Sequence, residues 1–315
     1  MSINRLDVQA AAARIEGQVL RTPLIEASLD ERRLWLKCEC LQAGGAFKLR
    51  GATNRLLLLD NAERARGVVA FSSGNHAQGV AIAARRLGIA ATIIMPSDAP
   101  QLKIDGTRAE GAKIIFYNRR TESREAISAE LAAESGATVV PSFDDRHIVA
   151  GQGTVGLEIL EQLAEAGAPP PPLIAMPIGG GGLAAGIALA CPDARILGAE
   201  PAGWDDMARS LALGSIVPVS ADTPPTLCDA LQTPRVSPIT FDILRDRGAT
   251  VVAVSDAEIG AAVRWAFVEH QLVVEPGGAA ALAALLAGKA EVEDGMVILL
   301  SGGNVDPALH AALIA

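Results

Sequence analysis

Aromatic residues and cysteines are scarce in this sequence, and both absences narrow its class. Of 315 residues, six are phenylalanine, three tryptophan and one tyrosine, while half of the chain is hydrophobic. The core must therefore consist largely of small and aliphatic side chains, and a chain with so much apolar surface to bury is not disordered. The four cysteines show neither a disulfide framework nor a C-x-x-C motif, which favours reduced thiols in a cytoplasmic protein. They are Cys38, Cys40, Cys191 and Cys228.

The sequence also lacks a basic character and a membrane-spanning segment. The net charge is −9 and no block of like charge occurs, which argues against nucleic acid and anionic membranes as the main partners. The longest apolar stretch, residues 173–190, contains Pro177 and four successive glycines, so it cannot form an unbroken spanning helix of about 20 residues. The first residues, MSINRLDVQ, carry no apolar block of a signal peptide. We therefore expect a cytoplasmic protein with no membrane partner.

Short β-branched runs alternate with amphipathic stretches along most of the chain. This alternation predicts an α/β fold in which helices cover both faces of parallel sheets. Four predicted strands lie between residues 67 and 144, and the others lie beyond residue 170. The predicted strands are 68–71, 91–95, 113–117, 137–140, 173–176, 195–199, 250–254 and 296–300.

The first chemical motif is a lysine among small and apolar neighbours. Lys48 lies in the segment GGAFKLRGA, residues 44–52. Desolvation lowers the proton affinity of an amine and makes it a nucleophile that can form a Schiff base. An ordinary surface lysine at a helix start is the alternative that this motif alone leaves open.

Polar or glycine-rich segments follow three of the predicted strands. The segment SSGNHAQG, residues 72–79, gathers hydroxyls, an amide and backbone N–H groups where a helix begins, which suits a carboxylate; the alternative is a polar helix cap. The segment PIGGGGL, residues 177–183, lets the backbone close on a phosphate, although it is not a Walker A loop. Ser301 ends the last strong strand, where α/β sheets bind ligands, or simply forms a Ser-Gly turn.

Together and in this order, the motifs closely resemble the fold-type II pyridoxal-phosphate enzymes, in the branch of serine/threonine dehydratases and serine racemases. The resemblance implies two parallel-sheet α/β domains of the tryptophan synthase β-like fold, with the cofactor in the cleft between them. Residues 1–66 and 145–315 would form a large cofactor-binding domain, and residues 67–144 a small mobile substrate domain. A homodimer is also implied. Matching pieces run from RTPL (21–24) through KCE (37–39), VAGQGT (149–154), GAEP (198–201) and EPGGA (275–279) to SGGNVD (301–306).

The resemblance implies a role for each motif in binding pyridoxal 5′-phosphate. Lys48 would hold the cofactor covalently, with Phe47 packed beside the ring, and Asn75 would hydrogen-bond the ring O3′. Ser301 would meet the pyridine nitrogen, and because a serine cannot keep that nitrogen protonated as a carboxylate would, elimination is favoured. The phosphate would be held by Gly179, Gly180, Gly181 and Gly182.

The implied activity is β-elimination on a 3-hydroxy amino acid, L-serine or L-threonine, to give a 2-oxo acid and ammonia. The freed amine of Lys48 would remove the Cα proton as a general base. Ser73 stands where racemase-like members carry a second serine, and its hydroxyl, opposite Lys48, could return a proton from the other face. Alternatives are a 3-hydroxyaspartate dehydratase, a serine racemase, or, outside the family, a non-catalytic nucleotide-binding α/β protein. The substrate carboxylate would be bound by Ser72, Ser73, Gly74, Asn75 and His76.

Two further stretches are racemase-like. The segment TESRE, residues 121–125, places Arg124 where it could reach a second substrate carboxylate, as in related 3-hydroxyaspartate dehydratases; the alternative is a helix-start arginine paired with a neighbouring acid. In EPAGWDD, residues 200–206, the side chains of Glu200 and Asp206 and the carbonyl of Trp204 match the family's divalent-cation site, whose oxygen ligands suit Mg²⁺, Ca²⁺ or Mn²⁺.

The chain also departs from the family pattern at two places. The segment QAGGAFK, residues 42–48, lacks the two hydroxyls of the usual Gln-x-Thr-Gly-Ser-Phe-Lys. The segment DALQT, residues 229–233, replaces the usual Asp-Gly-hydrophobic run beside the cofactor. Contacts around the lysine and on this side of the ring are therefore expected to differ from the usual ones.

Overall fold

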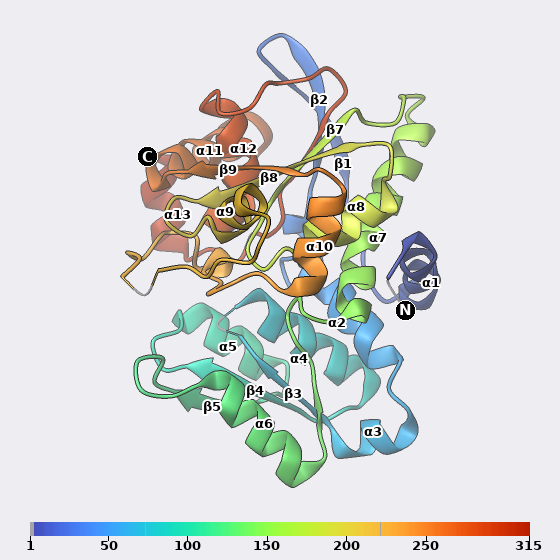
Figure 1. Ribbon diagram of the computed structural model, residues 1–315, viewed down its shortest axis with the longest axis vertical. Helices are drawn as coiled ribbons and strands as arrows, with labels where there is room; N and C mark the ends of the chain where they lie inside the picture. Colours follow the sequence, from blue (N-terminus) through green and yellow to red (C-terminus); the bar gives the residue numbers. More distant parts are fainter. Residues whose placement is uncertain (1–2, 73, 221) are drawn as a thin grey trace.

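The computed structural model describes residues 3–72, 74–220 and 222–315. They form two units, one above the other in Figure 1, each built around its own sheet. We call residues 67–144 the small unit and the remainder the large unit, following the bounds predicted for the two domains. Within the described ranges, no helix is long and apolar enough to cross a membrane.

The large unit contains a six-stranded sheet in the order β1-β2-β10-β7-β8-β9. All neighbouring pairs are parallel except β1 and β2, which form an antiparallel hairpin. Both faces are buried: Leu34 and Leu36 of β2 belong to one apolar cluster, and Trp35 between them belongs to another. The strands are β1 (Leu24–Leu29), β2 (Arg32–Lys37), β7 (Leu173–Pro177), β8 (Arg195–Pro201), β9 (Thr250–Val254) and β10 (Val297–Leu299).

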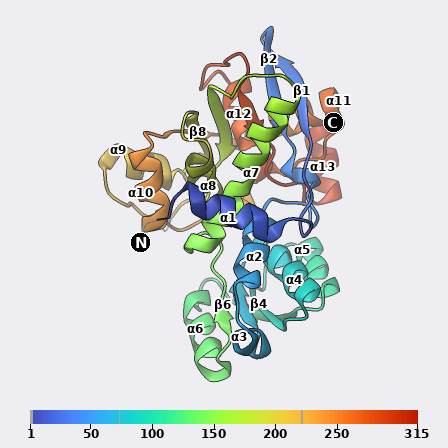
Figure 2. The same ribbon diagram turned by 90° about the vertical axis from the view of Figure 1, so that its right-hand side faces the viewer.

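Helices cover this sheet on both sides, as the two views of the ribbon show (Figures 1 and 2). The α-helices are α1 (Arg5–Ile15), α2 (Lys48–Leu57), α7 (Arg146–Glu165), α8 (Gly182–Ala190), α9 (Asp206–Leu213), α10 (Pro238–Asp246), α11 (Asp256–His270), α12 (Ala280–Leu286) and α13 (Pro307–Ile314). Single 3₁₀ turns are η1 (Glu39–Leu41), η2 (Asp229–Leu231) and η3 (Pro276–Ala279).

The small unit contains a four-stranded parallel sheet in the order β5-β4-β3-β6. Its apolar core also includes one face of α2 from the large unit, so this helix lies between the two units (Figure 2). Helix α3 (Asn61–Arg66) belongs to the large unit and leads into the small one. The elements of the small unit are β3 (Val68–Phe71), α4 (Asn75–Leu87), β4 (Ala91–Pro96), α5 (Gln101–Ala109), β5 (Lys113–Tyr117), α6 (Arg124–Ser135) and β6 (Thr138–Val139).

The predicted α/β fold with parallel sheets is confirmed, and each predicted strand is found. The antiparallel hairpin β1–β2, however, is not among the predicted elements. Its turn consists of Asp30 and Glu31, both with positive φ (50° and 60°). This conformation is usually indicated by Asn-Gly or Asp-Gly, and Asp-Glu gives no such signal.

Candidate active site

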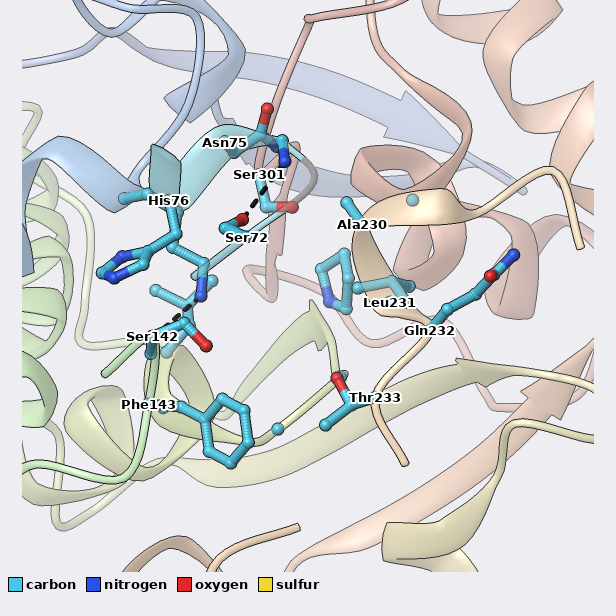
Figure 3. Close-up of a pocket in the computed structure, with 18 of the residues that line it drawn as sticks. Ser72, Asn75, His76, Ser142, Phe143, Ala230, Leu231, Gln232, Thr233 and Ser301 are labelled. Atoms are coloured by element: carbon cyan, nitrogen blue, oxygen red, sulfur yellow. Dashed lines mark hydrogen bonds between the residues drawn. The ribbon is translucent and has the colours of Figure 1, made fainter. Parts of the chain in front are cut away.

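A pocket lies between the two units and is lined by segments of both. The large unit contributes the start of α2, the glycine loop after β7, the η2 and η3 segments and Ser301 beyond β10. The small unit contributes the end of β3, the start of α4, the start of α6 and the segment 142–143. In Figure 3, Ser72, Asn75 and Ser301 lie on one side of the pocket, and Phe143 and Thr233 lie on the other. Predicted site residues that line it are Phe47, Lys48, Ser72, Gly74, Asn75, His76, Arg124, Gly179, Gly180, Gly181, Gly182 and Ser301. Ser73 lies outside the described residues.

Lys48 is held at the pocket by a helix that is anchored through buried charges. Two residues further along α2, the fully buried Arg50 pairs with Glu39 at 2.7 Å and with Glu158 of α7 at 2.6 Å. Glu158 also accepts from Lys37 of β2 at 2.7 Å. Breaking such a buried network leaves uncompensated charge, so α2 has one strongly preferred position.

The Lys48 amine is enclosed and has no compensating carboxylate among the described residues. Its Nζ donates to the backbone carbonyl of Ser142 at 3.0 Å. Because burial disfavours the ammonium form, the pKa of Lys48 is lowered to about 8. A substantial fraction of this amine is therefore neutral at physiological pH, as a nucleophile or base requires.

The segment that begins α4 presents polar groups to the pocket. Gly74 is the N-cap of α4 and gives no side-chain cap, so N–H groups of the first turn have no partner from that residue. The Oγ of Ser72 accepts from the N–H of Gly74 at 3.1 Å. His76 is buried, and its Nε2 lies 2.9 Å from the carbonyl oxygen of Val140. Burial and the nearby charge of Lys48 lower the pKa of His76 to about 3, so the imidazole is neutral.

Asn75 has partners that the sequence did not predict. Its Nδ2 donates to Glu275 Oε1, and its Oδ1 accepts from Asn304 Nδ2 at 2.9 Å. An amide nitrogen has two hydrogens, so one remains for the predicted contact with a ring oxygen. Glu275 and Asn304 belong to matching segments, EPGGA and SGGNVD, but their sequence positions gave no sign of a contact with Asn75.

The glycine loop is packed closely on several sides. It joins β7 to α8, and Gly181 has φ of 84°, a conformation that favours glycine. A methyl group on Gly180 would overlap the ring of Phe143, and one on Gly179 would lie 3.1 Å from Thr233 Oγ1. Thr240 Oγ1 donates to the carbonyl of Gly180 at 2.8 Å. A side chain at Gly180 would displace Phe143, and one at Gly181 would be strained by its positive φ. The backbone of the loop approaches the pocket at a helix N-terminus, as a phosphate site does.

Ser301 and Arg124 lie at two different parts of the pocket. Ser301 is buried, and its carbonyl accepts from Phe47 N at 3.2 Å, which ties it to the residue preceding Lys48. The Arg124 guanidinium lies over the ring of Phe71, 5.3 Å from its centroid, and Nε donates to Glu125 at 2.9 Å. Arg124 thus makes the local acid pair that was the alternative interpretation, and it also lines the pocket.

The three residues of the predicted cation site lie apart from this pocket. Glu200 is the next-to-last residue of β8, and its two carboxylate oxygens accept from Met207 N and Ala208 N at 3.0 and 2.9 Å. Burial raises the pKa of Glu200 to about 8 and that of Asp206 to about 7. Asp206 Oδ2 is buried and has no hydrogen-bond partner among the described residues. Trp204 lies on the loop between β8 and α9.

The donor set of the pocket fits pyridoxal phosphate. It offers an enclosed amine with a lowered pKa, an all-glycine loop at a helix start in which Gly180 and Gly181 have no room for a side chain, and a serine just after a strand. These groups match an aldehyde, a phosphate and a ring nitrogen, respectively.

Known proteins resemble the chain over almost its full length. The L-threo-3-hydroxyaspartate ammonia-lyase of a Pseudomonas species is 44% identical, over 98% of this chain and 97% of that protein. The serine racemase of Schizosaccharomyces pombe is 37% identical, over 98% of this chain and 96% of that protein. Among solved structures, a threonine deaminase from T.th. is 41% identical with a TM-score of 0.89, over 96% of this chain and 99% of that one. Maize serine racemase is 38% identical with a TM-score of 0.92, over 99% and 97%.

The match to a family covers most of the chain as well. Residues 15–302 match the family described as pyridoxal-phosphate dependent enzyme. This range includes Lys48, the glycine loop and Ser301, which surround the pocket described above. The chain therefore belongs to the family of pyridoxal-phosphate dependent enzymes.

Proposed function

We propose that the protein is an ammonia-lyase that eliminates water from a 3-hydroxy amino acid, with 3-hydroxyaspartate preferred over serine and threonine. The observation that carries this preference is the position of Arg124, a guanidinium at the edge of the pocket that contains Lys48. Two relatives named L-threo-3-hydroxyaspartate ammonia-lyase, at 44% and 41% identity, support it. The sequence alone favoured serine or threonine, with hydroxyaspartate as an alternative.

The cofactor would be held by Lys48, the loop Gly179–Gly182 and Ser301, with Phe47 beside the lysine. When bound, pyridoxal phosphate supplies an electron sink that makes the Cα proton of an amino acid removable. Ser301 carries a hydroxyl and not a carboxylate, so it leaves the ring nitrogen without a strong proton donor. This limits the lifetime of negative charge at Cα and favours prompt loss of the β-hydroxyl.

The residues of the chain would bind the substrate and move one proton. Ser72 and the N–H groups at the start of α4 would bind the α-carboxylate, because hydroxyl and amide donors at a helix N-terminus favour an anion. Neutral His76 would leave this site uncharged. The Nζ of Lys48 would accept the Cα proton, since its lowered pKa makes the neutral amine available near pH 7. Loss of the hydroxyl and hydrolysis of the released enamine would then give the 2-oxo acid and ammonia.

Arg124 would distinguish a dicarboxylate from serine. Its guanidinium can donate two parallel N–H hydrogen bonds to the second carboxylate of such a substrate. Its contact with Glu125 leaves other guanidinium donors for a ligand. Serine and threonine have no group for it to bind.

The test is an assay of 2-oxo acid release from L-serine, L-threonine and both L-3-hydroxyaspartate diastereomers. For wild-type protein we expect the highest kcat/KM with a hydroxyaspartate. Arg124→Ala should lower that value about 10- to 100-fold, as expected for the loss of a charge-assisted contact, and should leave serine nearly unchanged. Arg120→Ala is the matched control, because Arg120 is exposed in the preceding segment and does not line the pocket.

Two results would contradict the preference. Faster turnover of serine or threonine would establish a general dehydratase, and an equal loss for all substrates in Arg124→Ala would make Arg124 structural. Measuring the enantiomers of each amino acid in the same reactions tests the prediction that Ser73 returns a proton. If D-serine is undetectable while dehydration proceeds, that prediction is wrong.

We also propose that Glu200, Asp206 and the carbonyl of Trp204 bind a divalent cation. Support comes from the buried Oδ2 of Asp206, which has no partner within the described ranges, and from the two carboxylates near the start of α9. Saturating Mg²⁺, Ca²⁺ or Mn²⁺ should raise the unfolding midpoint by about 5 °C. Asp206→Asn should abolish the shift and Asp205→Asn should preserve it. A midpoint that none of the three cations changes would contradict the proposal.

A further inference from the structure

Three buried or half-buried charged groups from the two units meet beside the pocket. Lys103 of α5 is 3% exposed, and its Nζ lies 2.7 Å from Asp229 Oδ2 and 3.4 Å from Glu275 Oε2. Asp229 begins η2 and Glu275 precedes η3, so both carboxylates belong to the large unit, whereas Lys103 belongs to the small unit. Both carboxylates line the pocket, and Lys103 does not. The cluster therefore links the units without offering its ammonium directly to a ligand.

The stem of Lys103 also supports the segment proposed to bind the substrate. A Cβ placed on Gly74 would lie 3.1 Å from both Cδ and Nζ of Lys103. The lysine thus runs closely against the backbone at the N-cap of α4, where a larger residue than glycine would push it aside. A change at Lys103 is therefore transmitted to this segment by contact.

Glu275 connects the cluster to Asn75. It is 2% exposed, and its two oxygens have different partners: Oε1 accepts from Asn75 Nδ2, and Oε2 faces Lys103 Nζ. Burial, together with the neighbouring Asp229 carboxylate, raises the pKa of Glu275, and the Lys103 ammonium opposes this effect without cancelling it, so the pKa stays above its ordinary value. For Lys103, burial alone would lower the pKa, but the attraction of the Glu275 and Asp229 carboxylates is larger than the effect of burial. The pKa of Lys103 is therefore raised above its ordinary value. Each charge thus makes the other tolerable in a site that excludes water.

An ionised Glu275 fixes the orientation of the Asn75 amide. A carboxylate only accepts hydrogen bonds, so it must face the NH₂ end, and the Asn304 amide then donates to the oxygen end at 2.9 Å. If Glu275 were protonated, it could donate instead, and the opposite amide orientation would become competitive. The NH₂ end of Asn75 would then no longer be held at Glu275, and the predicted contact with the ring oxygen of the cofactor would lose its donor.

We propose that Lys103 is a positioning residue: its ammonium pairs with the Glu275 carboxylate and thereby fixes the Asn75 amide and the start of α4 against the cofactor pocket. This inference rests on the proposed function only through the predicted hydrogen bond between Asn75 and the ring O3′ of the cofactor. Under this proposal Lys103 acts through Glu275. The loss of the Lys103 ammonium can therefore be compensated by removing the charge of the Glu275 carboxylate. A lysine that bound substrate directly could not be compensated in this way.

The test compares Lys103→Met, Lys103→Arg, Glu275→Gln and the double variant Lys103→Met/Glu275→Gln. For Lys103→Met we expect a changed absorbance spectrum of bound pyridoxal phosphate without substrate, and kcat/KM lower by about 10- to 100-fold, as is usual when an outer partner of a site residue is lost. Lys103→Arg should keep the wild-type spectrum, because the charge remains. In the double variant, the side-chain oxygen at position 275 still accepts from Asn75, and this position has no carboxylate left without a partner. The wild-type spectrum should therefore return, and kcat/KM should be at least about tenfold higher than in Lys103→Met.

Controls separate this inference from folding and from the proposed function. Lys113→Met removes an exposed lysine of the same unit and should change neither spectrum nor activity. Circular dichroism checks folding, and if Lys103→Met fails to fold, the double variant should fold and show the wild-type spectrum. A wild-type spectrum in Lys103→Met, or effects of the two changes that simply multiply, would overturn the inference. If no substrate is turned over, the proposed function is wrong, while the spectra still decide the role of Lys103.

Discussion

At the scale of single residues, the pKa of Lys48 predicts how cofactor-free protein captures pyridoxal phosphate. Only a neutral amine attacks an aldehyde, and with a pKa of about 8 roughly one Lys48 in four is neutral at pH 7.5, against roughly one in a thousand for an ordinary lysine. The initial capture rate, followed by absorbance, should therefore rise with pH and level off above about pH 8. Lys48→Arg should show no such phase. A rate that continues to rise beyond pH 9 would mean that the amine is solvated.

The site residues could be predicted from the sequence where the signal is local. Lys48 stands in a run of small and apolar residues, and the structure encloses its amine. The run of four glycines is an equally local signal, and the structure leaves no room for a side chain at Gly180 or Gly181. Glu275 and Lys103 could not be assigned roles in this way. They are 172 residues apart, and only the fold brings an ordinary lysine and an ordinary glutamate together in a buried place.

At the scale of helices and strands, the alternation of short β-branched runs with amphipathic stretches predicted the positions of the parallel strands well. Buried strands such as β7 consist of short β-branched or apolar runs, because both faces of the sheet are covered. The hairpin β1–β2 escaped prediction because its strands mix charged and apolar residues and its turn is Asp30-Glu31. This hairpin occupies the edge of the large sheet, and β2 pairs with β10, the strand that leads to Ser301.

Helix α2 shows how an element can position a reactive amine beyond what its own sequence indicates. Its start carries Lys48, one face packs in the core of the small unit, and Arg50 is paired with acids from η1 and α7. A Cβ on Gly151 of α7 would lie 2.6 Å from Gly51 Cα in α2, and one on Gly51 would lie 2.5 Å from Gln152 Nε2 of α7, so neither position has room for a side chain. The amine is therefore fixed by contacts with both units, none of which the motif around Lys48 reveals.

At the scale of the whole molecule, the pocket is where the two units depend on each other. Two extended apolar clusters cover the large sheet, whereas in the small unit the edge strand β5 is only partly buried and Ser128 is the one buried residue of the fully described helix α6. Of the β5 residues, Lys113 and Phe116 are exposed and Tyr117 is buried. Because the small unit buries less apolar surface here, we expect its local stability to be lower than that of the large unit. A ligand that touches residues of both units adds stability that is lost when either unit unfolds.

This dependence predicts how removal of pyridoxal phosphate changes thermal unfolding. All three tryptophans, Trp35, Trp204 and Trp265, lie in the large unit, whereas far-ultraviolet circular dichroism reports helices of both units. In cofactor-free protein, the dichroism should begin to fall at a lower temperature than the tryptophan fluorescence changes, because the small unit melts first. Saturating cofactor should raise the midpoint by about 5 °C and make the two transitions coincide. Lys48→Ala, with cofactor added, should keep them separate. Coincident transitions in cofactor-free wild-type protein would instead show that the shared core around α2 is enough to make the two units unfold together.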